Sequence, residues 1–204
     1  MLGYLDPILF PDECEVVELS PGHYVYPIFK NGSSGIRDRA TRFLTPDGIG
    51  QIDHVDVYVR DPFERYVSGV QTYLRQNTHL DRNTALTMID QYLFLNRHFS
   101  LQFHWLMNLQ RYNDSAWITF RSMAELDNTV GETWNALTRD QTLVDYFQSN
   151  KKLHYYLQLD TVLAYDFMGK TVQFNHIVDH IKIKYPDLYK ETIERVKHLC
   201  AVLV

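Results

Sequence analysis

Hydrophobic and polar positions follow two different periods along the chain. Period-two patterns and short apolar runs, rich in β-branched and aromatic residues, predict strands at residues 23–29, 55–59 and 117–120. Helical spacing takes over directly after the second of these strands. The apolar residues of that stretch form one stripe, which consists of Phe63, Val67, Val70 and Leu74. Strands that alternate with helices indicate an α/β fold with a small, mostly parallel sheet flanked by helices.

Helical patterns dominate the rest of the chain and predict a helical C-terminal part. Further helices are expected at 84–94, 99–111, 122–131 (ending at Gly131), most of 140–168, and two stretches of 173–204 that break near Pro186. We find no internal repeat and no Pro/Gly/Ser-rich linker, so residues 1–204 are expected to form a single domain.

Composition narrows the choice of partners. The net charge of −5 and the pI near 6.0 provide no general basic field, so nucleic acid is not an expected partner. The chain has no run of 18 apolar residues and no basic stretch at its start, which predicts a cytoplasmic protein without a membrane span or signal peptide. Cys14 and Cys200 are too few and too far apart for a disulfide framework. The oligomeric state has no signature in the sequence.

The stretch YVYPIFKNGSSGI at 24–36 has two interpretations. Asn31-Gly32 is a strong hairpin signal, but the residues that follow do not alternate as a second strand would. They read better as a helix that begins with Ser33 or Ser34 as N-cap. Strand, Gly/Ser loop and helix would together form a phosphate-binding loop, with Lys30 as its charge. It is not a Walker A loop, because the lysine comes before the glycines.

The stretch VYVRDPFERYVSGV at 57–70 gives the second signal. Its helix start is well marked, with Asp61 as N-cap, Pro62 in the first turn and Glu64 as the partner in a capping box. Arg60 stands at the end of the strand, and Ser68 lies two turns into the helix. Arg65 and Ser68 are three residues apart and therefore neighbours on the helix surface, so an arginine and a hydroxyl near this helix start could form a second phosphate clamp. Alternatively, the arginines of this stretch pair only with the neighbouring carboxylates.

Together the two stretches resemble the paired signatures of sulfotransferases that use 3′-phosphoadenosine 5′-phosphosulfate (PAPS). Lys30-Asn31-Gly32-Ser33-Ser34 is similar to that family's 5′-phosphosulfate loop, Lys-x-Gly-[Ser/Thr]-[Ser/Thr]. Residues 60–68, RDPFERYVS, are similar to its 3′-phosphate motif, Arg-[Asp/Glu]-Pro-x-x-Arg-x-x-Ser. The resemblance is closest to the carbohydrate sulfotransferases and extends over about residues 23–126.

This resemblance implies a P-loop-like sulfotransferase fold and transfer of a sulfuryl group from PAPS to an acceptor hydroxyl. It implies adenosine 3′,5′-bisphosphate as the product and a small molecule, with a carbohydrate preferred, as the acceptor. Lys30 would be catalytic at the bridging oxygen, and no metal would be required. The cofactor would be held by the loop and by the second motif, through Lys30, Asn31, Gly32, Ser33, Ser34, Arg60 and Ser68. Arg65 is expected to buttress the helix or the cofactor loop.

The reaction also requires a general base. His98 is the first candidate, because polar residues surround it and Gln102 lies one helical turn further on. A capping or buried role for His98 is an equally good interpretation. His54 is a weaker candidate, and His104 next to Trp105 is expected to pack in the core. His176 and His180 have the i,i+4 spacing of some metal-binding helices, but no third ligand accompanies them, so they are expected on a solvated helix face rather than at zinc.

Two other functions remain open from the sequence. One is a nucleotide or small-molecule kinase on a related P-loop architecture, against which the position of Lys30 counts. The other is a non-catalytic nucleotide-binding protein of the same fold. Preference for a 3′,5′-bisphosphate over ATP without magnesium would exclude the first, and turnover with any acceptor would exclude the second.

Overall fold

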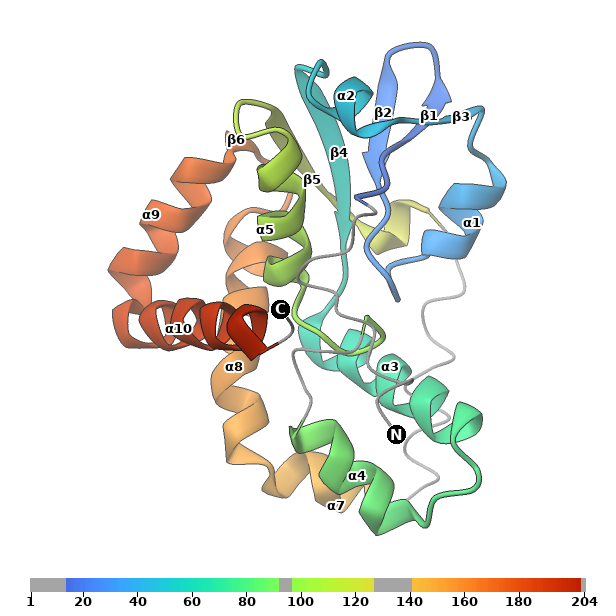
Figure 1. Ribbon diagram of the computed structural model, residues 1–204, viewed down its shortest axis with the longest axis vertical. Helices are drawn as coiled ribbons and strands as arrows, with labels where there is room; N and C mark the ends of the chain where they lie inside the picture. Colours follow the sequence, from blue (N-terminus) through green and yellow to red (C-terminus); the bar gives the residue numbers. More distant parts are fainter. Residues whose placement is uncertain (1–13, 92–96, 127–140, 203–204) are drawn as a thin grey trace.

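The structure, a computed structural model, describes residues 14–91, 97–126 and 141–202. Within them lies one mixed sheet of six strands, in the order β3-β1-β2-β4-β5-β6 (Figure 1). The strands are β1 (Val17–Ser20), β2 (His23–Tyr26), β3 (Arg42–Phe43), β4 (His54–Val59), β5 (Trp117–Ser122) and β6 (Thr171–Gln173). The α/β class is therefore confirmed.

The parallel part of the sheet is limited to its centre. Strand β4 pairs in parallel with β2 on one side and with β5 on the other. The edge strands β1, β3 and β6 pair antiparallel. The sheet is thus mixed rather than mostly parallel, but β2, β4 and β5 bring their carboxyl ends to the same edge. In open α/β sheets this edge is where ligands bind.

Helices lie on both sides of the sheet. Figure 1 shows α8, α9 and α10 on one side and α1 on the other, with α3, α4 and α7 toward the lower end. The α-helices are α1 (Ser33–Asp38), α2 (Pro46–Ile49), α3 (Pro62–Gln76), α4 (Arg82–Gln91), α5 (Gln102–Tyr112), α7 (Gln141–Ser149), α8 (Lys151–Thr161), α9 (Phe174–Lys184) and α10 (Pro186–Val202). Two short irregular helices complete the described chain: the 3₁₀ turn η1 (Met123–Glu125) and the π-helix η2 (Val162–Asp166).

Strand β4 separates two hydrophobic clusters. Val55, Val57 and Val59 point into the main core, which the helices α3, α5 and α8 help to build. On the opposite face, Tyr58 packs with Ile36 of α1 in a smaller cluster. Alternate residues of β4 thus pack into the main core on one face of the sheet and against α1, the helix that follows the Gly/Ser loop, on the other.

At the start of α3, one of the two hydrogen bonds of the predicted capping box is present. Asp61 Oδ1 accepts a hydrogen bond from the Glu64 amide at 2.9 Å, and Pro62 is the first helical residue. The carboxylate of Glu64 pairs with Arg60 Nε at 3.5 Å. The Arg60–Glu64 pair of the alternative interpretation is therefore present, but it is not the only contact of this side chain, because Arg60 Nη1 also lies 3.4 Å from Lys30 O.

Several element boundaries differ from the predictions. The first strand ends at Tyr26 rather than 29, and Gly32, not Ser33 or Ser34, is the N-cap of α1. The helix predicted over 122–131 begins as the 3₁₀ turn η1, and the expected end at Gly131 lies outside the described residues. The short strands β1, β3 and β6 and the helix α2 were not predicted. They are two to four residues long, too short to show a period.

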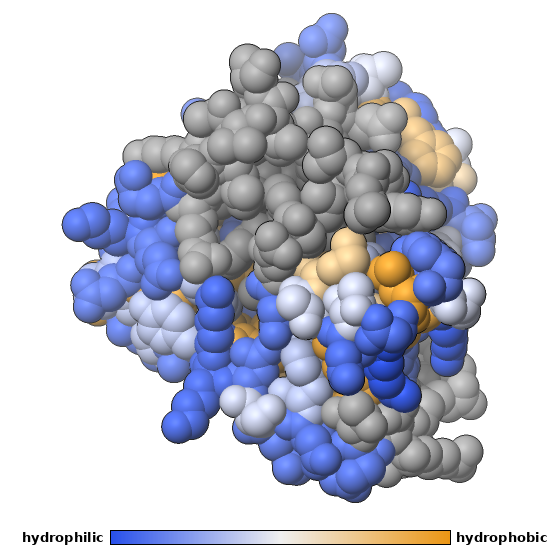
Figure 2. All heavy atoms as spheres, turned by 60° about the horizontal axis from the view of Figure 1, so that its bottom comes forward, coloured by the Kyte–Doolittle hydropathy of each residue, from blue (hydrophilic) through white to orange (hydrophobic). Residues whose placement is uncertain are grey.

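The surface at the lower end of the molecule is mostly hydrophilic. Figure 2 brings this end forward and shows small apolar areas scattered among the polar residues that are coloured. None of the described helices combines the length and the apolar character needed to span a bilayer.

Candidate functional site

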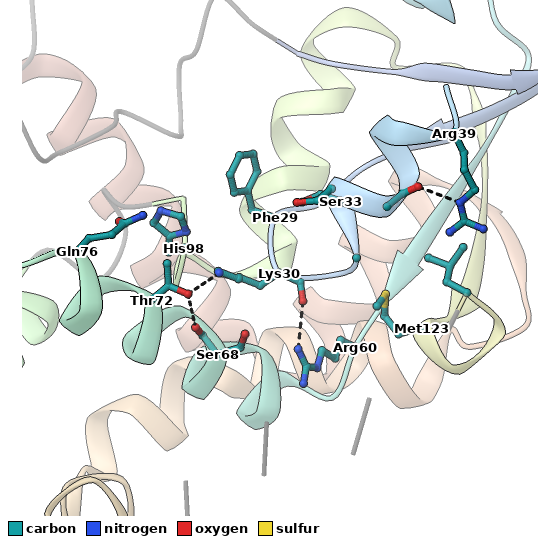
Figure 3. Close-up of a pocket in the computed structure, with 14 residues that line it drawn as sticks. Phe29, Lys30, Ser33, Arg39, Arg60, Ser68, Thr72, Gln76, His98 and Met123 are labelled. Atoms are coloured by element: carbon teal, nitrogen blue, oxygen red, sulfur yellow. Dashed lines mark hydrogen bonds between the residues drawn. The ribbon is translucent and has the colours of Figure 1, made fainter. Parts of the chain in front are cut away.

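A cavity of about 520 Å³ lies between the Gly/Ser loop and α3 (Figure 3). Its wall contains every site residue predicted from the sequence except Asn31. These residues are Lys30, Gly32, Ser33, Ser34, Arg60, Ser68 and His98. The two sequence signatures, about thirty positions apart, therefore meet at one cavity.

The loop has a left-handed backbone at two positions. Lys30 has φ 67° and Gly32 has φ 69°. A Cβ atom on Gly32 would also lie 3.0 Å from Cε of Met123, but that atom ends a flexible side chain, so the left-handed conformation is the main reason for glycine at this position. The turn is closed by hydrogen bonds from the Asn31 amide to Ile28 O at 3.1 Å and from the Ile36 amide to Gly32 O at 3.0 Å. This conformation excludes a hairpin at Asn31-Gly32, because the chain enters α1 directly.

Asn31 holds the loop from the inside. Its side chain is fully buried, and Nδ2 donates to Tyr58 O at 2.8 Å and to Gln102 Oε1 at 2.6 Å. Of the residues predicted to bind the cofactor, Asn31 is thus the one whose side chain points away from the cavity.

Gln102 joins the two signatures. Its Oε1 also accepts from the Arg60 amide at 3.0 Å, and its Nε2 donates to Arg60 O at 3.0 Å. The side chain of Gln102 therefore pairs with the backbone of Arg60 and with the amide group of Asn31 at the same time. Sequence reasoning noted Gln102 only as a neighbour of His98, and no local pattern could reveal these distant partners.

Arg60 lies at the base of the cavity. Its side chain is 9% exposed, and Nη1 donates to Lys30 O at 3.4 Å. The contact from Nε to Glu64 is 3.5 Å long, so both of these contacts of the guanidinium are near the limit of hydrogen bonding. Ser68 lines the same cavity from α3.

Arg65 supports the loop rather than lining the cavity. Its buried guanidinium donates from Nε to Phe29 O at 2.9 Å and from Nη1 to Ser100 O. The hydrogen bond to Phe29 confirms the expected buttress of the loop. Burial lowers the pKa of Arg65 to about 10, partly opposed by the negative charge of Asp160.

Positive charge accumulates around Lys30. Its pKa is lowered first by burial and then by the positive charges of Arg65, Arg75 and Arg60. Since neighbouring cations disfavour one another, an anion in the cavity would relieve this repulsion. The electrostatics therefore fit an anionic ligand.

His98 lines the end of the cavity toward which the Lys30 side chain points (Figure 3). Its ring is half-buried and meets Phe29 edge-on, with 5.9 Å between ring centroids. The backbone of His98 lies so close to Gly69 of α3 that any Cβ on Gly69 would overlap the His98 carbonyl oxygen. Close packing against α3 thus sets the position of this histidine.

The other histidines lie elsewhere. His54 is exposed on the sheet, where Nε2 is 2.7 Å from Thr119 Oγ1, and it does not line the cavity. His104 is fully buried, which confirms its predicted core position, and burial lowers its pKa to about 3. His180 contacts Asp166 at 2.8 Å on the exposed side of α9. Within the described part of the chain, no three His, Cys, Asp or Glu side chains are grouped so as to hold a metal ion.

Further cavity residues were not predicted from the sequence. They are Phe29, Gly35, Arg39, Thr72, Gln76, Met123 and Leu126. Thr72 and Gln76 could have been found, because they follow Ser68 at intervals of four along α3 and must share its face. The residues near β5 could not, since only the parallel pairing of β4 with β5 brings them to the cavity.

We compared the chain with models of protein families, with curated proteins and with solved structures, and none of them matches it.

Proposed function

We propose that this protein is a sulfotransferase that moves a sulfuryl group from PAPS to an acceptor hydroxyl, with a carbohydrate as the preferred acceptor class. The proposal includes a P-loop-like sulfotransferase fold. The observation that carries it is the meeting of Lys30, Arg60 and Ser68 in one cation-rich cavity. These residues come from the two motifs that resemble the sulfotransferase signatures.

The cavity suits a nucleotide in size and in chemistry. Its volume of about 520 Å³ lies within the usual range for small-molecule sites. Ser33 and Ser34 line the same cavity as Lys30, and their hydroxyl groups would suit a 5′-phosphosulfate. Arg60 and Ser68 supply a guanidinium and a hydroxyl for a 3′-phosphate.

Each residue has a defined task in the proposed transfer. The acceptor oxygen forms a bond to sulfur while the bond from sulfur to the 5′-phosphate oxygen breaks, so negative charge grows on the departing phosphate. Lys30 stabilises that charge. His98 receives the proton of the acceptor hydroxyl, since it lies at the same end of the cavity as the lysine amine.

Selective nucleotide binding tests the proposal directly. A saturating concentration of adenosine 3′,5′-bisphosphate should raise the Tm, because a ligand at about a hundred times its Kd adds roughly 2.7 kcal/mol to stability. AMP, which lacks the 3′-phosphate, should shift the Tm much less. Arg60→Ala should remove the difference between the two nucleotides, whereas Arg42→Ala, a loss of one exposed charge on β3, should preserve it.

Equal shifts with the two nucleotides would overturn the role of Arg60 and Ser68. Turnover is then measured with ³⁵S-labelled PAPS and a panel of sugar and small-molecule acceptors. Bisphosphate binding without transfer to any acceptor would favour a non-catalytic nucleotide-binding protein. A magnesium-dependent preference for ATP would favour a kinase.

A further inference from the structure

The wall of the cavity formed by α3 extends beyond the proposed phosphate clamp. Ser68, Thr72 and Gln76 are spaced by four residues and all line the cavity. At 1.5 Å per residue this row is about 12 Å long. The proposed function uses only the first member of the row.

Thr72 makes two hydrogen bonds that fix the direction of its hydroxyl. The group donates to Ser68 O at 3.0 Å, one turn back along α3, and accepts from Lys30 Nζ at 2.6 Å (Figure 3). A hydroxyl has one hydrogen, and here the backbone carbonyl engages it. The lone pairs of Thr72 therefore remain available to the ammonium group of Lys30.

Lys30 needs such a contact more than most lysines do. Its side chain has four rotatable bonds, and holding it in one position costs considerable conformational entropy. The positive charges of Arg60, Arg65 and Arg75 also repel the amine from the interior. A neutral acceptor on the wall of the cavity offsets both effects without cancelling the charge of the lysine.

We propose that Thr72 is a positioning residue that holds the Lys30 amine at the end of the cavity next to His98 and Gln76. This inference rests on the proposed function of Lys30. It specifies where transfer occurs: one helical turn beyond Ser68, toward Gln76. The acceptor is then expected to enter from the end of the cavity lined by Gln76, while the nucleotide extends toward Arg39 and Met123 at the other end.

A pair of substitutions separates the hydroxyl from the shape of the side chain. Thr72→Val keeps the shape but cannot accept a hydrogen bond, and it should lower kcat about tenfold to a hundredfold, as expected for loss of a hydrogen bond to a charged group. The Kd for adenosine 3′,5′-bisphosphate should change less than about threefold, because the Ser68 and Arg60 contacts remain. Thr72→Ser restores the hydroxyl and should recover most of the activity.

Thr87→Val is the matched control. Thr87 makes the same type of bond, from its hydroxyl to the carbonyl of Asn83 at 2.9 Å, but on α4 and away from Lys30. The substitution Thr87→Val should leave kcat unchanged. If Thr87→Val and Thr72→Val lowered kcat equally, the effect would be general to helix hydroxyls, and the inference would be wrong.

A second measurement does not depend on turnover. In protein with isotope-labelled lysine, the NMR signal of the Lys30 amine should indicate a single ordered position. In Thr72→Val that signal should be averaged by motion of the side chain. The pKa of Lys30 should also fall further, because the charged amine loses a hydrogen-bond acceptor. Unchanged Lys30 signals in this variant would overturn the inference even where bisphosphate binding still supports the proposed function. Conversely, ordered Lys30 signals that depend on Thr72, in a protein that does not bind the bisphosphate, would leave the contact intact and refute the sulfotransferase instead.

Discussion

At the scale of single residues, Lys30 combines an unfavourable backbone with an unfavourable charge environment. Among the described residues it is the one non-glycine position with a positive φ. A left-handed conformation costs an L-residue roughly 1–2 kcal/mol. A glycine would adopt this backbone without strain. The loop has a lysine there in spite of the conformational cost, which indicates that the side chain of Lys30 has a role. Strain of this kind is found at functional sites.

Substitution of Lys30 should separate chemistry from binding. Lys30→Ala should lower kcat by about a hundredfold or more, because the amine acts on charge that develops during transfer. Its effect on bisphosphate affinity should be much smaller, whereas Arg60→Ala should weaken that affinity about tenfold to a hundredfold. Steady-state kinetics and calorimetric titration of both variants measure the two effects. Near-normal turnover of Lys30→Ala would contradict the role of the loop.

The sequence predicts which residues belong to the site, but it does not predict which way each side chain points. The sequence indicates that Lys30 and Ser68 belong to anion-binding patterns, and both line the cavity. It does not indicate that Asn31 turns inward, because that depends on Gln102, which lies 71 residues away. Side chains that meet through distant partners leave no local pattern.

At the scale of elements, the position of α3 depends on a glycine that the sequence motifs did not single out. Gly69 lies in the middle of the helix, where glycine is intrinsically unfavourable. A side chain there would collide with the backbone of His98 and approach Cβ of Phe99 to 3.1 Å. Gly69 thus permits close contact between α3 and the segment that carries the candidate base.

Gly69→Ala should therefore destabilise the protein although it raises helix propensity. We expect a loss of about 3 kcal/mol, the upper range for overpacking, since a backbone carbonyl cannot move aside as a flexible side chain does. Gly50→Ala is the control, because its Cβ would meet only ordinary contacts at 3.5 Å. Urea unfolding of the two variants makes the comparison. Equal stability of both would show that the contact with His98 is not fixed.

The long elements were predictable because their periods extend over many residues. The sequence predicts the apolar stripe of α3, its N-cap Asp61 and its first residue Pro62, whereas the Glu64 half of the predicted capping box is absent because Glu64 pairs with Arg60. The two-residue strand β3 and the three-residue strand β6 contain too few positions to show alternation. They form because β1 and β5 offer free edges for pairing.

At the scale of the whole molecule, a buried carboxylate connects α8 with α5. Asp160 is 1% exposed and accepts hydrogen bonds from the amides of Gln102 at 2.7 Å and Phe103 at 3.0 Å. Burial raises its pKa to about 6, although the positive charge of Arg65 and these amides act in the opposite direction. The start of α5, which includes Gln102, is therefore bound to a carboxylate whose raised pKa lies near neutral pH.

This raised pKa should make stability depend on pH. Between about pH 4 and 6 the folded protein keeps the Asp160 proton that the unfolded chain has released, so stability falls with rising pH, by about 1.4 kcal/mol per unit from this group. Asp160→Asn should remove this component, whereas Asp179→Asn, at an exposed carboxylate, should not. Urea unfolding from pH 4 to 7 measures the difference between each variant and the parent. A pH dependence unchanged by Asp160→Asn would show that Asp160 does not titrate in this range.

The pairing of Gln102 with Asn31 and Arg60 has a consequence for the kinetics of association. These hydrogen bonds lie in the interior, so the two halves of the cavity are fixed relative to each other before any ligand arrives. A nucleotide that enters does not have to assemble its site, and its association rate is then set by diffusion and by attraction to the local positive charge. Nucleotides that differ by one phosphate would then differ in association rate only through their charge, and most of the difference in affinity would lie in the dissociation rate. The protein would distinguish them mainly by how long each one stays bound.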